Sequence, residues 1–231
     1  MKGYVLLLDL LGFSNIVRNL QSKDLDLRIK EWITLIEQAA HESSVIKLSM
    51  LSDTIFAAAD PSEEGLKSLI AMAKTILNEG IKQSFPVKGA ITFGEYTWGN
   101  LIYGKAVIDA HELESQQTWV GISCANNLPH LKTAWGFDSL LCYPTPKKSG
   151  SICLHPVISW NPPEYEQFQS YLSMKGLSRS GEIISWSWAD RIQHTIAFAL
   201  YKRILVAANG VPNKFHGMLP IQIIDLNMKH I

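Results

Sequence analysis

Two aspartates stand where short apolar segments end, and their positions suggest chemistry at one shared site. Asp9 closes the apolar run 3–9, and Asp53 separates the strand-like segments 45–50 and 54–59. In a unit of strand, helix and hairpin, the first strand can lie beside the hairpin, so the two carboxylates can meet. Neighbouring carboxylates repel each other unless one takes a proton or a cation neutralises them. Hard oxygen ligands suit Mg²⁺ or Mn²⁺, and a pair of such ions commonly serves displacement at phosphorus.

A glycine-containing turn follows the first aspartate directly. Backbone amides of such a turn, at the start of the next helix, can bind phosphate oxygens. Each feature also has an ordinary explanation, because Asp often caps a helix and Ser-Asp is common in turns. Both aspartates lie on elements expected to be neighbours, which favours the metal interpretation. The turn consists of Leu10, Leu11, Gly12, Phe13 and Ser14.

The expected elements alternate in a way that defines a fold class. Apolar residues at helical spacing predict a helix over 25–42 and another that opens at Asp60, whose side chain is the N-cap candidate. The resulting fold class is α+β: a ferredoxin-like βαββαβ sheet with helices on one face. The remaining expected elements are strands at 87–95, 118–124, 138–143 and 151–157 and a helix at 106–114.

A proline-rich turn, Asn161-Pro162-Pro163, marks the expected domain boundary. Residues 1–160 are expected to form the catalytic domain. Residues 161–231 are expected to form a mostly helical extension, packed on that domain or on a dimer partner. Its apolar stripe consists of Trp188, Ile192, Ile196 and Ala199.

Composition limits the classes of protein to which the chain can belong. The 231 residues carry no net formal charge, and Lys and Arg are scattered, so no nucleic-acid partner is expected. Three cysteines without metal-type spacing favour a reducing compartment. Asp9 interrupts the N-terminal apolar run, and no segment reaches bilayer length, so neither a signal peptide nor a membrane partner is expected. A cytoplasmic protein is the expectation.

The order of four segments resembles the class III nucleotide cyclases over about residues 3–125. The segments are LLLDLLGFS, LSDTIF, VKGAITFGE and YGKAVIDAHELE. The resemblance implies that Asp9 and Asp53 bind two Mn²⁺ or Mg²⁺ ions per active site, with the backbone carbonyl of Leu10 as a further metal ligand. It implies that residues 11–14 hold the triphosphate of a nucleoside triphosphate. It also implies a homodimer with active sites at the subunit interface.

Four positions depart from the purine-specific members of that family. The Asn and Arg that stabilise the transition state there are matched by Ile108 and Glu112, and the two purine-reading residues by Ser49 and Leu101. The helix segment GKAVIDAHELE is closer to the bacterial pyrimidine cyclases of the Pycsar anti-phage systems. That resemblance implies synthesis of cyclic UMP or cyclic CMP, which acts on a separate cyclic-nucleotide-binding effector.

Three lysines and one serine are weaker candidates. Strand alternation puts Lys47 and Ser49 on the face opposite Leu48, where they can read the base edge or simply contact solvent. Lys88 and Lys105 are candidates for balancing phosphate charge, and Lys105 is favoured because it opens a helix. Ordinary surface lysines are the alternative for both.

The expected function is a phosphorus–oxygen lyase that converts UTP to 3′,5′-cyclic UMP and pyrophosphate. UTP is preferred over CTP only because uridylate cyclases are the commoner type in the resembling group. A cytidylate cyclase is one alternative, and a degenerate nucleotide-binding or dimerisation module is another, motivated by Ile108 and Glu112. A polymerase or diguanylate cyclase is a weaker hypothesis, because the hairpin reads LSDTI.

Overall fold

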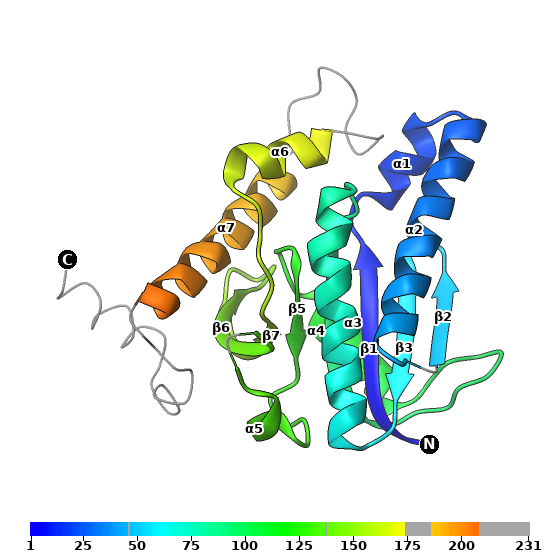
Figure 1. The fold of residues 1–231 in the computed structure, drawn as a ribbon, viewed down its shortest axis with the longest axis vertical. Helices are drawn as coiled ribbons and strands as arrows, with labels where there is room; N and C mark the ends of the chain where they lie inside the picture. The colour runs from blue at the N-terminus through cyan, green and yellow to red at the C-terminus, as the bar shows by residue number, and fades with distance from the viewer. Residues whose placement is uncertain (46, 137, 174–185, 208–231) are drawn as a thin grey trace.

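The computed structural model describes residues 1–45, 47–136, 138–173 and 186–207. Within them one mixed sheet has the strand order β2-β3-β1-β4-β5-β7-β6, with helices on both of its faces (Figure 1). The strands are β1 (Lys2–Leu10), β2 (Lys47–Leu51), β3 (Thr54–Ala59), β4 (Val87–Glu95), β5 (Gly121–Cys124), β6 (Leu140–Pro146) and β7 (Ile152–Ile158). The helices are α1 (Phe13–Asn19), α2 (Ser22–Glu42), α3 (Glu63–Lys82), α4 (Lys105–Ser115), α5 (Leu131–Ala134), α6 (Tyr165–Ser173) and α7 (Trp186–Ala207).

Strand β1 is central, and its sequence reflects that position. It pairs antiparallel with β3 on one side and with β4 on the other. Residues 4–8 are almost completely buried, because helices cover both faces of the sheet here. A strand buried on both faces needs apolar residues without alternation, which explains the continuous apolar run before Asp9.

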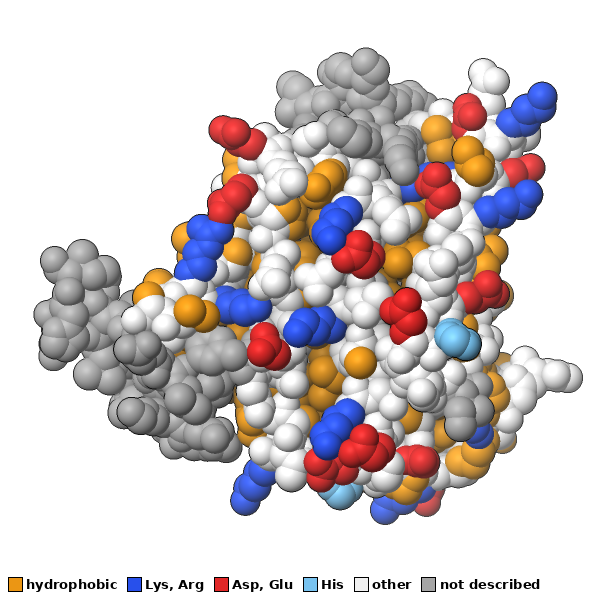
Figure 2. Space-filling view, in the orientation of Figure 1, with side chains coloured by type: hydrophobic (Ala, Val, Ile, Leu, Met, Phe, Trp, Pro, Cys, Tyr) orange, Lys and Arg blue, Asp and Glu red, His pale blue; other side chains and the backbone are white. Residues whose placement is uncertain are grey.

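Helices α2 and α3 cover the face of β1 that carries Tyr4, Leu6 and Leu8. The apolar residues whose helical spacing predicts α3 form its buried side, since Leu66 and Leu69 are fully buried. Its N-cap is Ser62 and not Asp60: the Ser62 hydroxyl accepts a hydrogen bond from the Gly65 amide at 3.0 Å. Figure 2 shows acidic and basic side chains interspersed over this side of the molecule.

Helix α4 lies on the opposite face of the sheet. Its Ala106 packs with Val5, and its Ala110 packs with Leu7 and Ala90. The α+β fold class is as predicted. The predicted arrangement with helices on one face holds for α2 and α3, whereas α4 covers the other face. Helix α4 crosses to the other face because β1 and β4 present small or apolar side chains on that face as well.

Several boundaries differ from the prediction. The helix expected over 25–42 begins at Ser22 and follows a separate short helix, α1. The strand expected at 118–124 begins at Gly121, because residues 118–120 bend and bury the indole of Trp119. The strands expected at 138–143 and 151–157 are β6 and β7, each shifted toward the C-terminus.

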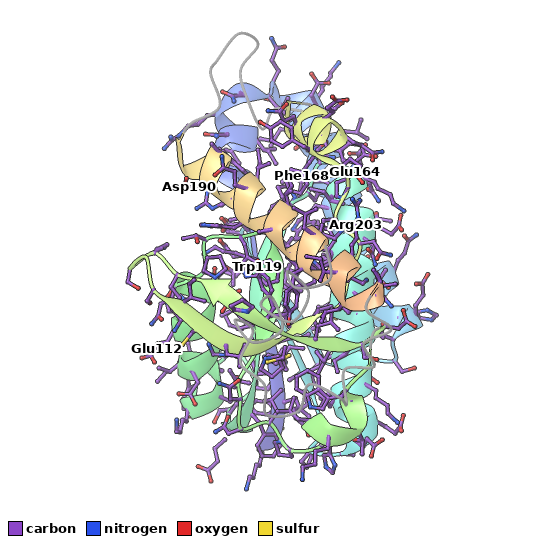
Figure 3. All side chains as sticks on the ribbon, turned by 90° about the vertical axis from the view of Figure 1, so that its left-hand side faces the viewer. Glu112, Trp119, Glu164, Phe168, Asp190 and Arg203 are labelled. Carbon is purple, nitrogen blue, oxygen red and sulfur yellow. The ribbon has the colours of Figure 1, made fainter. Side chains whose placement is uncertain are left out.

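Helix α7 packs across the β5–β6 side of the sheet. Its Phe198 and Tyr201 join Tyr143 and Trp119 in an aromatic cluster with ring centroids 5.1–5.3 Å apart, and Figure 3 shows Trp119 beside this helix. Of the stripe expected here, Ile192 is fully buried, while Trp188 and Ile196 are partly buried against the core. Within the described chain, no helix combines the length and hydrophobicity needed to cross a bilayer.

Candidate active site

The structure brings Asp9 and Asp53 together at the end of β1. Asp9 pairs with Thr54 in the β1–β3 ladder, and Asp53 directly precedes Thr54. The next residue along β1, Leu10, donates its amide hydrogen to the Asp53 carbonyl oxygen at 3.1 Å. The sheet register therefore fixes the two aspartates as neighbours, which is the proximity that the sequence predicts.

The environment of Asp9 disfavours its ionised form. Burial raises the pKa of the Asp9 carboxyl, and the negative charges of Glu114 and Asp53 raise it further. Lys88 and Arg191 act in the opposite direction without cancelling that effect. A carboxylate in this state is stabilised by any cation that binds beside it.

Lys88 lies on β4, directly opposite Asp9 of β1. It pairs with Asp9 in the β1–β4 ladder, and its Nζ lies 3.8 Å from an Asp9 oxygen. The same ammonium group contacts the carboxylate of Glu114 from α4. Both side chains of the Lys88–Glu114 pair are more than nine-tenths buried, so the pair ties α4 to the sheet beside Asp9.

The turn after Asp9 has the geometry of a helix start. Gly12 has a φ of 82°, which glycine adopts without steric cost, and its carbonyl accepts from the amides of Asn15 and Ile16. The amides of Leu10 and Leu11 are already used, by Asp53 and by Pro86. The amides of Phe13 and Ser14 lie in the first turn of α1, where amides have no acceptor within the helix, so both can donate to a ligand.

The base-reading candidates lie further along the hairpin. Ser49 pairs with Phe56, and Lys47 pairs with Ala58, four residues from Thr54. Four residues of strand span about 13 Å and two span about 7 Å, so Lys47 is remote from the acidic pair and Ser49 lies about half as far from it along the hairpin. Leu48 and Met50 pack against the core, which confirms the predicted alternation.

Lys105 is not brought to the acidic pair within one chain. It opens α4 next to Gly104, which packs against Glu95 at the end of β4 remote from Lys88. Its ammonium group is exposed and pairs with Asp109 at 2.7 Å. A role for Lys105 in this site therefore needs a second copy of the chain.

The family-specific positions on α4 face solvent. Ile108 is 59% exposed, and Glu112, labelled in Figure 3, is also exposed. Glu114, near the end of the same helix, does reach the site, because its carboxylate contacts the ammonium group of Lys88. The sequence gives no direct sign of this contact, because a buried Lys–Glu pair between a strand and a helix depends on tertiary packing.

Arg191 is a further residue that sequence reasoning missed. It belongs to the first turns of α7, and its charge acts on Asp9 although about 180 residues separate them in the chain. Burial lowers the pKa of the Arg191 guanidinium, and Asp9 opposes that shift.

The donor set suits a hard divalent cation. Asp9 and Asp53 offer carboxylate oxygens, and Leu10 follows Asp9 with a backbone carbonyl. Oxygen ligands of this type are those that Mg²⁺ and Mn²⁺ prefer. Among the described residues, no cluster of three or more His, Cys, Asp or Glu side chains is arranged to bind a metal, so any ion here would complete its coordination with carbonyl, substrate or water oxygens.

Comparison with solved structures places this arrangement in a known fold. A bacterial light-regulated adenylyl cyclase superposes with a TM-score of 0.51 at 10% identity, covering 74% of this chain and 96% of that one. The guanylate cyclase domain of RhGC from Catenaria anguillulae, solved with GTP, gives 0.52 at 16% identity, covering 68% and 95%. The adenylyl cyclase CyaB from P. aeruginosa gives 0.50 at 17% identity, covering 71% and 95%.

Searches by sequence find nothing comparable: no family model and no curated protein matches the chain. Identities of 10–17% establish the fold alone. The chain has the fold of the class III nucleotide cyclase catalytic domains, with the acidic pair at the end of its central strand.

Proposed function

We propose that the chain is a nucleotide cyclase that converts UTP to 3′,5′-cyclic UMP and pyrophosphate. The observation that carries the proposal is the meeting of Asp9 and Asp53 in a fold shared with adenylyl and guanylyl cyclase domains. One of those domains was solved in complex with GTP, which supports a nucleoside triphosphate as the class of substrate.

The residues of the site have distinct roles in this proposal. Asp9, Asp53 and the Leu10 carbonyl hold two Mn²⁺ or Mg²⁺ ions, which when bound supply charge neutralisation and a more acidic 3′-hydroxyl. The amides of Phe13 and Ser14 orient the polyphosphate at the start of α1. With the substrate held there, the bond from the 3′-oxygen to the α-phosphorus forms and the bond to the leaving pyrophosphate breaks, and the hydroxyl proton is released to solvent. Orientation supplies much of the rate, since both reacting groups belong to one molecule.

The pyrimidine preference rests on the residues that differ from purine cyclases. Ser49 and Leu101 stand at the purine-reading positions, and Leu101 is 68% exposed. Lys47 and Ser49 then read the edge of a smaller base, with CTP as the alternative substrate. In this proposal the cyclic nucleotide is a second messenger of Pycsar-type anti-phage defence and acts on a separate effector.

A homodimer with shared active sites belongs to the same proposal. Apolar side chains are exposed on α4 and on the segment before it: Leu101, Tyr103 and Ile108 are each more than half exposed. Burial of such side chains favours association, and a second chain is the route by which Lys105 reaches an acidic pair.

The experiment is an incubation of the purified protein with each of the four ribonucleoside triphosphates and Mn²⁺, followed by separation of the products. We expect cyclic UMP from the wild type and none from Asp9→Asn or Asp53→Asn. Asp24→Asn, an exposed change in the first turn of α2, is the matched control and retains activity. Undiminished product from Asp9→Asn would refute the metal assignment.

A nucleotide-binding or dimerisation module without turnover is the second candidate. It is favoured by Ile108 and Glu112, an apolar and an acidic residue at the positions where purine cyclases have the Asn and Arg that stabilise the transition state. Nucleotide binding by wild type, lost in Asp9→Asn, without any cyclic product from any of the four nucleotides would identify this alternative.

A further inference from the structure

Helix α7 is fixed to the sheet by polar contacts at defined positions. The Thr195 hydroxyl oxygen accepts the amide hydrogen of Val120 at 3.0 Å, and Thr195 is fully buried. Nδ1 of His194 lies 3.0 Å from the carbonyl oxygen of Thr118. Near the other end of the helix, the Tyr201 hydroxyl donates to the Cys142 carbonyl at 2.8 Å. These contacts set both the position and the rotation of α7 on the sheet.

The contact of Thr195 places the preceding turn of α7 beside the acidic pair. Val120 adjoins Gly121, which pairs with Lys88, and Lys88 pairs with Asp9. These residues form one row across three strands that lie about 4.8 Å apart. Arg191 is one helical turn before Thr195, whose hydroxyl also donates to the Arg191 carbonyl at 2.6 Å. In Figure 1 the first turns of α7 lie at the same end of the sheet as the head of β1.

The guanidinium of Arg191 is near Asp9 without forming an ion pair with it. Its field acts on the Asp9 carboxylate, yet none of the carboxylates in the described chain contacts it as a salt-bridge partner. Its Cζ lies 5.5 Å from the ring centroid of Trp188, one turn earlier on α7, and this contact restricts where the side chain points. The group is half-buried, and burial lowers the pKa of Arg191, so an anion beside it would offset the cost of its desolvation.

Lys88, the other cation beside Asp9, is already paired with a carboxylate. Lys88 contacts Glu114 as well as Asp9, so two carboxylates share its single charge. A nucleoside triphosphate brings several negative charges into this site, and Lys88 has little capacity left for them. Of the two basic side chains that act on Asp9, Arg191 is the one that contacts no carboxylate of the described residues.

We propose that Arg191 binds the phosphate groups of the nucleotide held at Asp9 and Asp53, so that α7 contributes a catalytic residue to the site. The inference rests on the proposed function in taking a nucleoside triphosphate as the ligand. The guanidinium presents two parallel N–H donors to phosphate oxygens, a geometry that lysine cannot reproduce. The position corresponds to no segment of the cyclase resemblance, which ends near residue 125, and it supplies a positive charge that Glu112 cannot.

The test compares three variants of α7 with the wild type. Arg191→Gln removes the charge, Arg191→Lys keeps the charge without the paired donors, and Arg203→Gln is the matched control. Arg203 lies on the same helix, 12 residues or about 18 Å after Arg191, but is exposed and pairs with Glu164, both labelled in Figure 3. Binding of inorganic tripolyphosphate in the presence of Mn²⁺ is measured by calorimetry. Cyclic nucleotide formation is measured separately as kcat and KM, and a thermal melt checks the fold of each variant.

We expect Arg191→Gln to weaken tripolyphosphate binding at least about tenfold, as loss of a charge-assisted pair of hydrogen bonds does. Arg191→Lys should fall between it and the wild type, and Arg203→Gln should match the wild type. If Arg191→Gln does not fold, the comparison of Arg191→Lys with Arg203→Gln decides in the same way. Equal binding by Arg191→Gln and wild type overturns the inference, and so does an equal loss in Arg203→Gln or no binding by the wild type.

The failure of this inference is distinguishable from failure of the proposed function. If cyclic product forms and depends on Asp9 but not on Arg191, the cyclase function stands and the role of α7 is refuted. Tripolyphosphate binding that depends on Arg191, without any cyclic product, keeps the anion site and removes the cyclase.

Discussion

Lys88 of β4 and Glu114 of α4 form a buried ion pair directly beside Asp9. Their side chains are 8% and 4% exposed, so neither charge is stabilised by water. The pair therefore acts on two levels: it fastens α4 to the sheet, and it keeps a positive charge 3.8 Å from an Asp9 oxygen. Changes at this pair affect stability and the site together.

Lys88→Met is expected to destabilise the protein by about 3–5 kcal/mol, because it leaves the Glu114 carboxylate buried without its partner. The double variant Lys88→Met/Glu114→Leu should recover most of that loss, since an apolar pair replaces the ionic one. Urea unfolding of the two variants and of Glu114→Leu measures the coupling. A Lys88→Met variant within about 1 kcal/mol of the wild type would show that the charge is not buried in solution.

Asp9→Asn is expected to raise the melting temperature of the protein prepared without divalent ions. Burial and the charges of Glu114 and Asp53 raise the pKa of Asp9 in the folded state, so ionisation of Asp9 opposes folding. The contribution of Asp9 to stability is fully present below its unfolded pKa near 3.8 and is lost as the pH rises through its folded pKa.

The advantage of Asp9→Asn over the wild type should therefore be absent in acid and appear as the pH rises. Thermal melts in a chelating buffer across that range measure it. Added Mn²⁺ should stabilise the wild type but not Asp9→Asn, because only the wild type retains the charged ligand. A melting temperature for Asp9→Asn below that of the wild type at neutral pH would contradict the electrostatic argument.

Thr195→Val is expected to cost about 1–3 kcal/mol, because the buried amide of Val120 loses its acceptor. Thr195→Ser keeps the hydroxyl and is the control, with a much smaller cost. Since Thr195 also sets the position of Arg191, the valine variant should raise KM for the triphosphate as well. Unfolding curves and steady-state kinetics of the two variants separate these effects, and equal behaviour of valine and serine would exclude the proposed anchor.

Lys105 has a test of its own, because it lies far from Asp9 within one chain. If Lys105 acts across a dimer interface, each active site takes Asp9 from one chain and Lys105 from the other. Asp9→Asn and Lys105→Ala then remove groups that different chains contribute. Each variant alone is then expected to be inactive or severely impaired. A 1:1 mixture should regain about a quarter of the wild-type activity, because half of the dimers carry one intact site. No recovery after mixing, with dimers present by sedimentation, would remove Lys105 from the site.

The sequence predicts those parts of the site that depend on local pattern and on neighbouring elements. Alternation in β2, the tight hairpin at Asp53 and the apolar run before Asp9 are local features, and the strand–helix–hairpin order makes the two aspartates neighbours. The fold class follows from the same order of elements. Helix α3 is predicted because the spacing of its apolar residues is helical throughout.

The parts that were not predicted depend on packing between distant segments. The face that α4 covers is decided by the small residues of β1 and β4, and the Lys88–Glu114 pair depends on that choice. The position of Arg191 depends on the contact of Thr195 with Val120, across 75 residues of sequence. A local pattern of apolar and charged residues does not encode such contacts.

The docking of α7 has a consequence for the order of events during synthesis. The strands that carry Asp9 and Lys88 and the hairpin that carries Asp53 are complete about 95 residues before Arg191 is added, an interval of several seconds at ordinary rates of translation. A nascent chain can therefore assemble its acidic pair while the arginine is still inside the ribosome. If Arg191 binds the phosphates, a chain that ends before α7 has the acidic pair and the start of α1 but lacks this arginine.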